Sequence, residues 1–296
     1  MEINKICTHS GTFHADEVTA IAILKLIFKD ADIIRSRDKN DLESSDMRVD
    51  VGMKYSPDTN DYDHHQKEGA GKRNNLISYA SAGLIWKHFG DKLVSNSQIH
   101  EKIDRKIIQT IDAIDVGYKP YTFKETEPYT ISHIIQSFNP LRSKAQKGDY
   151  DKGFFKAVDL VMEILVNEIN ILEEADRCKK LILEKINNTD KEYLILEEPL
   201  IWKNTVITES SMKFVIVNDK DEDKWIAVTV PVEPGSFEAR LDFPKAWGGL
   251  EEEELRKTSG VDDAIFCHND LFIAVAKSKE GAISLVEKAL ENSILG

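Results

Sequence analysis

The sequence predicts an α/β protein: an N-terminal parallel sheet with helices on both faces, a long connecting helix, and a smaller C-terminal α/β domain. Three observations support this. Apolar strand-like runs alternate with apolar helical segments in the N-terminal part. A long segment then repeats apolar residues at the three- and four-residue spacing of a helix. After that segment, short strand-like runs dominate the rest of the chain.

The N-terminal part starts with a predicted strand at Ile3–Thr8 and a helix at Ala15–Phe28, joined by Ser10-Gly11-Thr12. The helix is apolar on nearly every side, as expected of a helix that packs against a sheet. The other elements predicted in this part are strands at Ile33–Ser36, Arg48–Gly52 and Tyr62–His64 and helices at Tyr79–Phe89 and Ser97–Ile114.

The connecting helix is predicted over Phe154–Ile186 and would be about 50 Å long at 1.5 Å per residue. A closing helix is predicted at Gly281–Leu290. The strands predicted between them are Tyr193–Leu196, Lys213–Asn218, Trp225–Pro231, Phe237–Asp242, Ala264–His268 and Phe272–Lys277. We place the domain boundary near residue 187, with a metal-binding catalytic domain at 1–187 and a substrate-binding domain at 188–296.

Composition limits the class of protein. The chain has 296 residues and a formal net charge of −13, which gives no sign of a basic nucleic-acid-binding face. The three cysteines, Cys7, Cys178 and Cys267, form no Cys-x-x-Cys pair, so we expect reduced thiols in a reducing compartment. No run approaches the roughly 18 apolar residues of a membrane span. We expect a cytoplasmic protein without a membrane partner.

The strongest functional signal is a set of polar residues at the ends of predicted strands. Four of the eight histidines lie within the first 65 residues, beside acids. Ligands of open α/β sheets bind outside the carboxyl ends of the strands, so these segments are expected to converge. The residues are His9, His14 and Asp16 after the first strand, Asp50 within Val49-Asp50-Val51, and Asp63, His64 and His65 after a later strand.

Mixed histidine and carboxylate ligands suit manganese, iron, cobalt or zinc better than magnesium alone. A carboxylate shared by two ions would hold them about 3.5–4 Å apart, the arrangement used in phosphoryl chemistry. Asp50 is the candidate bridge, because a carboxylate buried in a strand is costly without compensating cations. A lone His-His pair is usually a surface feature. The concentration of these residues at strand ends therefore carries the prediction of a two-metal centre.

Several segments resemble the melanocyte proliferating gene family: THSGTFHADEVTAIAIL, the DVG at Asp50–Gly52, YDHHQ at Tyr62–Gln66, IDAIDVG at Ile111–Gly117 and the C-terminal SGVDDAIFCHNDLFIAVAKSKEGAI. That family is similar to the DHH phosphoesterases, so the resemblance implies a DHH-like N-terminal domain. It also implies a metal-dependent phosphodiesterase, a 3′–5′ exonuclease on RNA or short oligonucleotides. Two divalent ions are implied, manganese first, with zinc, iron, cobalt or magnesium as alternatives.

The resemblance also implies roles for individual residues. One ion would be held by His9, His14 and Asp50. The second would be held by Asp16, Asp50, His64 and an acid of the fourth motif, either Asp112 or Asp115. His65 would face the scissile phosphate, with Asp63 orienting the histidines, so Asp50, Asp63 and His65 are the predicted catalytic residues.

The first motif departs from the wider superfamily, which has His-x-x-x-Asp-x-Asp where this chain has His9-x4-His14-x-Asp16. The departure leaves the metal identity and the spacing of the ions open. In the C-terminal domain, Arg240 and His268 are predicted to bind substrate phosphate across an interdomain cleft. A surface salt bridge of Arg240 to Asp242 or Glu238 is the alternative.

Two other functions stay open at this point. One is hydrolysis of a small phosphate compound, which the net charge of −13 favours. The other is a non-catalytic, metal-bound regulatory protein. The sequence also leaves open the substrate, the metal in the cell and whether the chain forms a homodimer.

Overall fold

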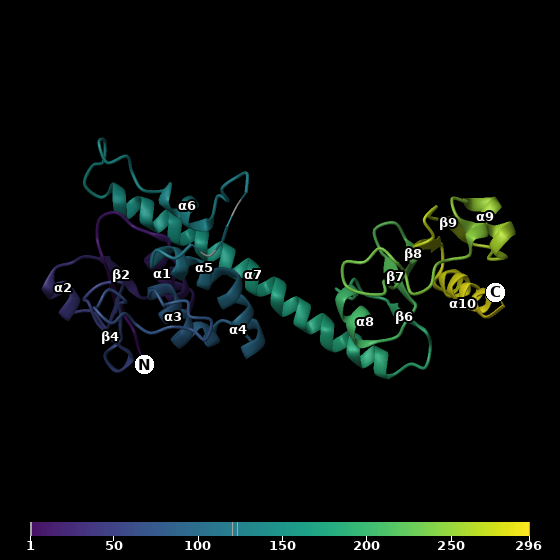
Figure 1. Cartoon of the computed structure of the whole chain (residues 1–296), viewed down its shortest axis with the longest axis horizontal. Coiled ribbons are helices and arrows are strands. Elements are labelled where there is room, and N and C mark those ends of the chain that lie inside the picture. The colour runs from purple at the N-terminus through teal and green to yellow at the C-terminus, as the bar shows by residue number, and fades with distance from the viewer. Residues whose placement is uncertain (1, 120, 123, 296) are drawn as a thin grey trace. The chain divides into compact units, whose positions relative to one another are not determined.

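The computed structural model describes residues 2–119, 121–122 and 124–295. The chain divides into two compact units, Met1–Glu173 and Glu174–Gly296. Each unit contains one five-stranded sheet. The predicted α/β class with two sheets and a long helix, α7 (Asp149–Asn187), is confirmed (Figure 1).

The N-terminal sheet has the strand order β2-β1-β3-β5-β4. The first four strands in this order run parallel, as predicted, and β4 is an antiparallel edge strand. A two-residue edge strand is too short to show a periodicity of its own, so β4 could not be predicted from the pattern. The strands are β1 (Lys5–Thr8), β2 (Asp32–Arg35), β3 (Met47–Val49), β4 (Tyr55–Ser56) and β5 (Asp61–Tyr62).

Helices lie on both faces of this sheet. On one face, α1 (Ala15–Ile27) and α3 (Ser81–Phe89) pack in the core that also contains Ile6 and Met47. Arg48 follows Met47, so its side chain points to the opposite face. There it donates to the carbonyl oxygen of Leu42, in α2 (Lys39–Glu43).

The predicted helix at Ser97–Ile114 is interrupted. The structure has α4 (Ser97–Ile103), a π-helical turn at Asp104–Ile108, and α5 (Gln109–Asp115). A π-helical turn rotates the residues that follow it relative to a regular helix, and such turns occur frequently at functional sites. A further short helix, α6 (Ile131–Gln136), was not predicted. Short 3₁₀ turns lie at Pro57–Thr59, Gly90–Lys92 and Lys245–Trp247.

The long helix α7 belongs to both units. Phe154 and Leu165, from its first part, pack in the N-terminal core. Cys178 and Ile182, from its second part, pack against the C-terminal sheet. For this reason the compact units divide at Glu173, inside the helix, rather than near residue 187, where the helix ends.

The C-terminal sheet has the order β6-β7-β8-β10-β9, with β6 and β7 parallel and the other pairs antiparallel. One face is covered by α9 (Glu252–Ser259) and α10 (Lys279–Leu295), and the other by α7 and α8 (Lys203–Glu209). The strands are β6 (Tyr193–Leu196), β7 (Phe214–Asp219), β8 (Lys224–Thr229), β9 (Ala264–Cys267) and β10 (Ile273–Ala276).

One predicted strand is wrong. The segment Phe237–Asp242 forms only an isolated bridge, between Ala239 and Pro231, and Phe237 is fully exposed. The strand that leads to Pro231, β8, is already paired with β7 on one side and β10 on the other, so it leaves no free edge along which this pairing could extend. Within the described part of the chain, no helix is long and apolar enough to cross a membrane.

Candidate metal centre

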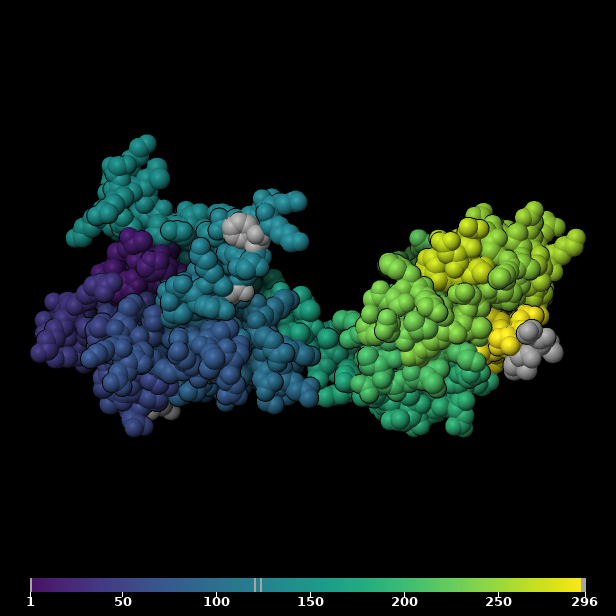
Figure 2. Space-filling view, in the orientation of Figure 1, coloured from purple at the N-terminus to yellow at the C-terminus, as the bar shows by residue number. Residues whose placement is uncertain are grey.

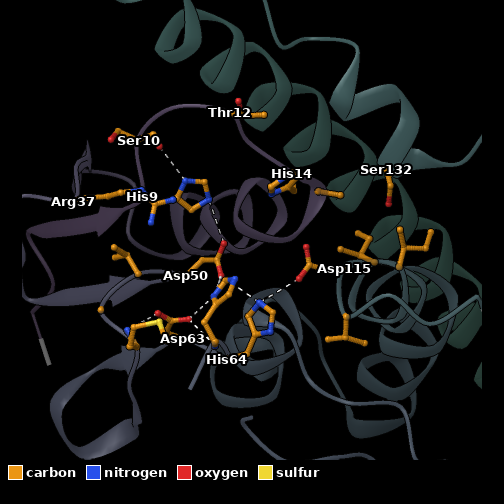
Figure 3. A pocket seen from close by; sticks show the side chains of 18 of the residues that line it. His9, Ser10, Thr12, His14, Arg37, Asp50, Asp63, His64, Asp115 and Ser132 are labelled. Atoms are coloured by element: carbon orange, nitrogen blue, oxygen red, sulfur yellow. Dashed lines mark hydrogen bonds and ion pairs between the residues drawn. The ribbon is translucent and has the colours of Figure 1, made fainter. Parts of the chain in front are cut away.

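A pocket of about 850 Å³ opens in the N-terminal unit where β1, β3 and β5 end (Figure 3). The sequence-predicted residues at these three strand ends meet there, as expected for a parallel sheet. The predicted residues that line the pocket are His9, His14, Asp50, Asp63, His64, His65 and Asp115. Asp16 is buried and has a carboxylate oxygen 3.6 Å from His64 Nε2.

Asp50 lies at the centre of the cluster. It follows β3 rather than lying within it, and its φ of 54° is in the left-handed region. Asp tolerates this conformation better than most residues because its short polar side chain bonds locally. One carboxylate oxygen is 3.4 Å from His9 Nε2, and the other is 3.4 Å from both His64 Nε2 and His65 Nδ1. Ser81 donates its hydroxyl to Asp50 Oδ1 at 3.1 Å.

His64 Nε2 is buried and makes no hydrogen bond among the described residues. Oxygens of Asp16, Asp50 and Asp115 nevertheless lie 3.6, 3.4 and 3.2 Å from it. Donor atoms bound to one ion at roughly 2.1 Å lie about 3.0 Å apart at right angles and about 3.4 Å apart at tetrahedral angles. A buried, unbonded nitrogen facing three carboxylates is therefore the arrangement of a cation site. The residues present fit a divalent metal ion.

Asp16 is held by the start of α3. Its two carboxylate oxygens accept hydrogen bonds from the backbone N–H groups of Ser81, at 2.9 Å, and Ala82, at 2.6 Å. Free N–H groups and the helix dipole make a helix N-terminus favourable for a carboxylate. The side chain is thereby fixed in the orientation that points toward His64.

Asp63 orients His65. Asp63 Oδ1 accepts the backbone N–H of His65 at 3.0 Å and lies 2.8 Å from its Nδ1. The other oxygen accepts the backbone N–H of Met53 at 2.6 Å. The His65 side chain is 52% exposed, whereas Asp63 is buried. The imidazole therefore faces the open pocket, and the Asp63 carboxylate fixes its orientation.

The loop between β1 and α1, which carries His9 and His14, is held from outside the pocket. Asn139 accepts the backbone N–H of Phe13 at 3.1 Å and donates to its carbonyl at 2.9 Å. Arg35 donates to the carbonyl of Gly11 at 2.7 Å. Figure 2 shows this loop in purple beside the teal segment that follows α6. These contacts limit the movement of the two histidines.

The two candidates of the fourth motif are separated by the structure. Asp115 lines the pocket and faces His64. Asp112 is fully buried with both oxygens engaged, one by Arg73 at 2.6 Å and the other by the backbone N–H of Gly83 at 2.9 Å. The assignment of Asp112 as a ligand is therefore corrected, and Asp115 is retained.

The charges of the pocket favour a cation. Burial lowers the pKa of His9, but the carboxylates of Asp50 and Glu17 outweigh this and raise it to about 10. His64 is also buried, and Asp115 and Asp50 raise its pKa to about 11. Burial, reinforced by the charges of Asp50 and Asp115, raises the pKa of Asp16 well above its ordinary value. Burial alone would raise the pKa of Asp50, but the neighbouring imidazoles of His64 and His9, each 3.4 Å away, hold that pKa below its ordinary value.

Two pocket-side residues were missed by the sequence reasoning. Glu17 is fully buried in the first turn of α1, 2.8 Å from His9 Nε2. Its position three residues after His14 is the capping-box spacing, which could have indicated it. Arg37, just after β2, lines the pocket and is labelled near His9 in Figure 3. A single arginine in a loop carries no sequence signal.

The structure gives Arg240 a different role from the predicted one. Its guanidinium donates to the carbonyls of Ile207, Ser210 and Met212 at 2.6–2.9 Å, around the end of α8. These bonds satisfy helix-end carbonyls, and they replace both the predicted phosphate contact and the alternative salt bridge. His268 lies in the turn between β9 and β10, where its Nδ1 accepts the backbone N–H of Asp270 at 3.0 Å. Its phosphate-binding role stays a prediction.

Comparisons with known proteins confirm the family resemblance that the sequence motifs indicated. A family model described as "Uncharacterised protein family (UPF0160)", named for the MYG1 exonuclease, matches residues 5–290. MYG1 exonuclease from Mus musculus is 31% identical, over 97% of this chain and 84% of that protein. MYG1 protein from Dictyostelium discoideum is 32% identical, over 97% of both chains.

Among solved structures, RecJ from Thermus thermophilus, in complex with Mg²⁺, matches with 14% identity and a TM-score of 0.28, over 99% of this chain and 50% of that one. The family assignment does not depend on this weak structural likeness. It depends on the family model and on the relatives that match 97% of this chain, and from these the chain belongs to the MYG1 exonuclease family, UPF0160.

Proposed function

We propose that this chain is a metal-dependent phosphodiesterase of the exonuclease type, acting on RNA or short oligonucleotides in the 3′–5′ direction. The observation that carries the proposal is the position of Asp50, whose two oxygens face His9 on one side and His64 and His65 on the other. A carboxylate between two groups of ligands is suited to bridging two ions. The family's name, shared with relatives called exonucleases, supports this class of enzyme.

His9, His14 and Asp50 would hold one ion, and Asp16, Asp50, His64 and Asp115 the other. Manganese is the proposed metal because the ligands mix imidazole and carboxylate. When bound, two such ions supply a water that ionises near neutral pH and positive charge that stabilises the transition state of phosphoryl transfer.

The remaining pocket residues would act on the substrate. His65 is oriented by Asp63 and open to solvent, so it can donate a hydrogen bond to a phosphate oxygen. Arg37 makes no ion pair within the described part of the chain and lines the same pocket. Its guanidinium is therefore suited to binding the substrate phosphate next to the scissile one. It would supply in the N-terminal unit the contact that the sequence reasoning assigned to Arg240.

The test is a substrate and metal screen of the purified chain. Oligoribonucleotides labelled at either end, dinucleotides and pyrophosphate are each incubated with Mn²⁺, Mg²⁺, Co²⁺ or Zn²⁺. We expect stepwise shortening from the 3′ end with Mn²⁺, and no turnover by Asp50→Asn. If pyrophosphate is the only substrate hydrolysed, the enzyme acts on a small phosphate compound and not on RNA or oligonucleotides. Metal binding without turnover of any substrate would favour a regulatory protein.

A second variant separates binding of metal from turnover. His65→Ala should keep the metal content and lose rate on the order of 10²-fold, as for other positioned proton donors. The matched control is His88→Ala, because His88 lies outside the pocket and bonds the hydroxyl of Tyr55 at 2.8 Å. Equal effects of the two substitutions on the rate would contradict the role of His65.

A further inference from the structure

Glu17 is a buried carboxylate in need of a cation. Its relative exposure is 0%, and the backbone N–H of His14 lies 3.0 and 3.1 Å from its two oxygens. A carboxylate without access to water is costly unless positive charge compensates it. The nearby Arg35 already ion pairs with Asp151 and bonds to the carbonyl of Gly11.

The group that faces Glu17 is His9, whose two ring nitrogens have different neighbours. Nδ1 lies 3.3 Å from the carbonyl oxygen of Ser10, which can only accept a hydrogen bond, so Nδ1 carries the proton and donates. In the neutral ring this leaves the lone pair on Nε2. Nε2 in turn faces two carboxylates, Glu17 at 2.8 Å and Asp50 at 3.4 Å. A lone pair and two carboxylates repel one another unless a proton or a metal ion lies among them, and a bound metal ion would take the place of that proton.

These separations match donor atoms around a single ion, which lie about 3.0 Å apart at right angles for bonds of roughly 2.1 Å. Potential ligand atoms of His9, His14 and Glu17 all lie within 4.8 Å of one another. An outer residue that only orients a metal-bound histidine contacts its other ring nitrogen, which here faces Ser10. Glu17 is instead on the metal side of the ring.

We propose that Glu17 is a direct ligand of the ion held by His9 and His14, an inference that rests on the proposed two-metal function. The ion would then have two imidazoles, the Glu17 carboxylate and the shared Asp50 carboxylate. Two nitrogen ligands select a transition metal over magnesium, so this site should discriminate against Mg²⁺.

The test is titration of Mn²⁺ into the metal-free full chain, followed by calorimetry, for wild type and Glu17→Gln. Gln keeps an oxygen that accepts the N–H of His14 but removes the charge. We expect two bound ions in wild type, and one site weakened by more than about 100-fold in the variant, beyond the 10- to 100-fold effect of an outer residue. The control Glu254→Gln removes a carboxylate from the first turn of another helix, α9, and should change neither site.

Two further measurements keep the inference falsifiable. The visible spectrum of the Co²⁺-loaded protein reports the ligands directly and should change in Glu17→Gln. If that variant does not fold, Glu17→Asp keeps the charge with a shorter reach and should weaken the same site less severely. Two sites of unchanged affinity and an unchanged spectrum would overturn the role of Glu17 while leaving the proposed function intact. No Mn²⁺ binding by wild type would instead remove the proposed function itself.

Discussion

Ser81 offers a sensitive test of how the centre is held, because one substitution removes a single contact of the central carboxylate. Ser81 is fully buried, and its hydroxyl donates to Asp50 Oδ1 at 3.1 Å. Its backbone N–H donates separately to Asp16. Ser81→Ala therefore removes the bond to Asp50 while keeping the bond to Asp16 and the helical backbone of α3.

The expected magnitude follows from that bond. A hydrogen bond to a charged group contributes about 1.5–3 kcal/mol. Outer residues that orient metal ligands contribute about 10- to 100-fold in metal affinity, which corresponds to about 1.4–2.7 kcal/mol. The two ranges agree, so Ser81→Ala should weaken Mn²⁺ binding by about 10- to 100-fold without changing the number of sites.

The assay is calorimetric titration of Mn²⁺ together with urea unfolding in chelator. The matched control is Ser278→Ala, which removes a serine hydroxyl bonded to the carboxylate of Asp263 at 2.5 Å in the C-terminal unit. The control should lose stability and keep its affinity for Mn²⁺. The reasoning is refuted if Ser81→Ala loses stability like the control and binds Mn²⁺ as tightly as wild type.

Three further predictions concern the fourth motif, pH and the C-terminal unit. Asp115→Asn should lose one of two metal ions on metal analysis, whereas Asp112→Asn should keep both; the reverse pattern would contradict the structural choice between them. In metal-free protein the pKa values of His9 and His64 are raised to about 10 and 11, so their contribution to the free energy of unfolding is complete below about pH 6.5 and disappears as pH rises through 10–11. Mn²⁺ must displace these protons, so at pH 8 the heat of Mn²⁺ binding should vary with the ionisation heat of the buffer, as expected when binding releases protons. A heat of binding that is the same in every buffer would contradict this prediction. Arg240→Ala should lower the free energy of unfolding by about 3 kcal/mol through lost bonds to the end of α8, with KM unchanged; a raised KM at full stability would restore its phosphate role.

Much of the fold could be predicted because the deciding signals are local. The apolar periodicity of α1 and α7 and the alternation of strands and helices come from residues close together in sequence. The meeting of His9, Asp50 and His64 was predictable for a related reason. In a parallel sheet the carboxyl ends of the strands share one edge, so polar residues after each strand converge.

What only the tertiary structure decided depends on contacts between distant segments. Asp112 and Asp115 are chemically equivalent in sequence, and the choice depends on Arg73, which bonds Asp112 from far along the chain. The proposed role of Glu17 depends on the orientation of one imidazole ring, which the carbonyl of Ser10 and the carboxylate of Asp50 determine together.

The failure of the predicted strand at Phe237–Asp242 has the same origin. An alternating pattern indicates that a segment can pair, but pairing also needs a neighbouring strand with a free edge, and β8 is already paired with β7 and β10. Arg240 consequently lies outside a sheet and bonds the end of α8. Local pattern and residue type therefore indicated most of the candidate site residues, although not Glu17 or Arg37. Only the three-dimensional packing decided which of them lie close enough to share an ion, because coordination depends on separations of a few ångströms between atoms that the chain brings together only when it folds.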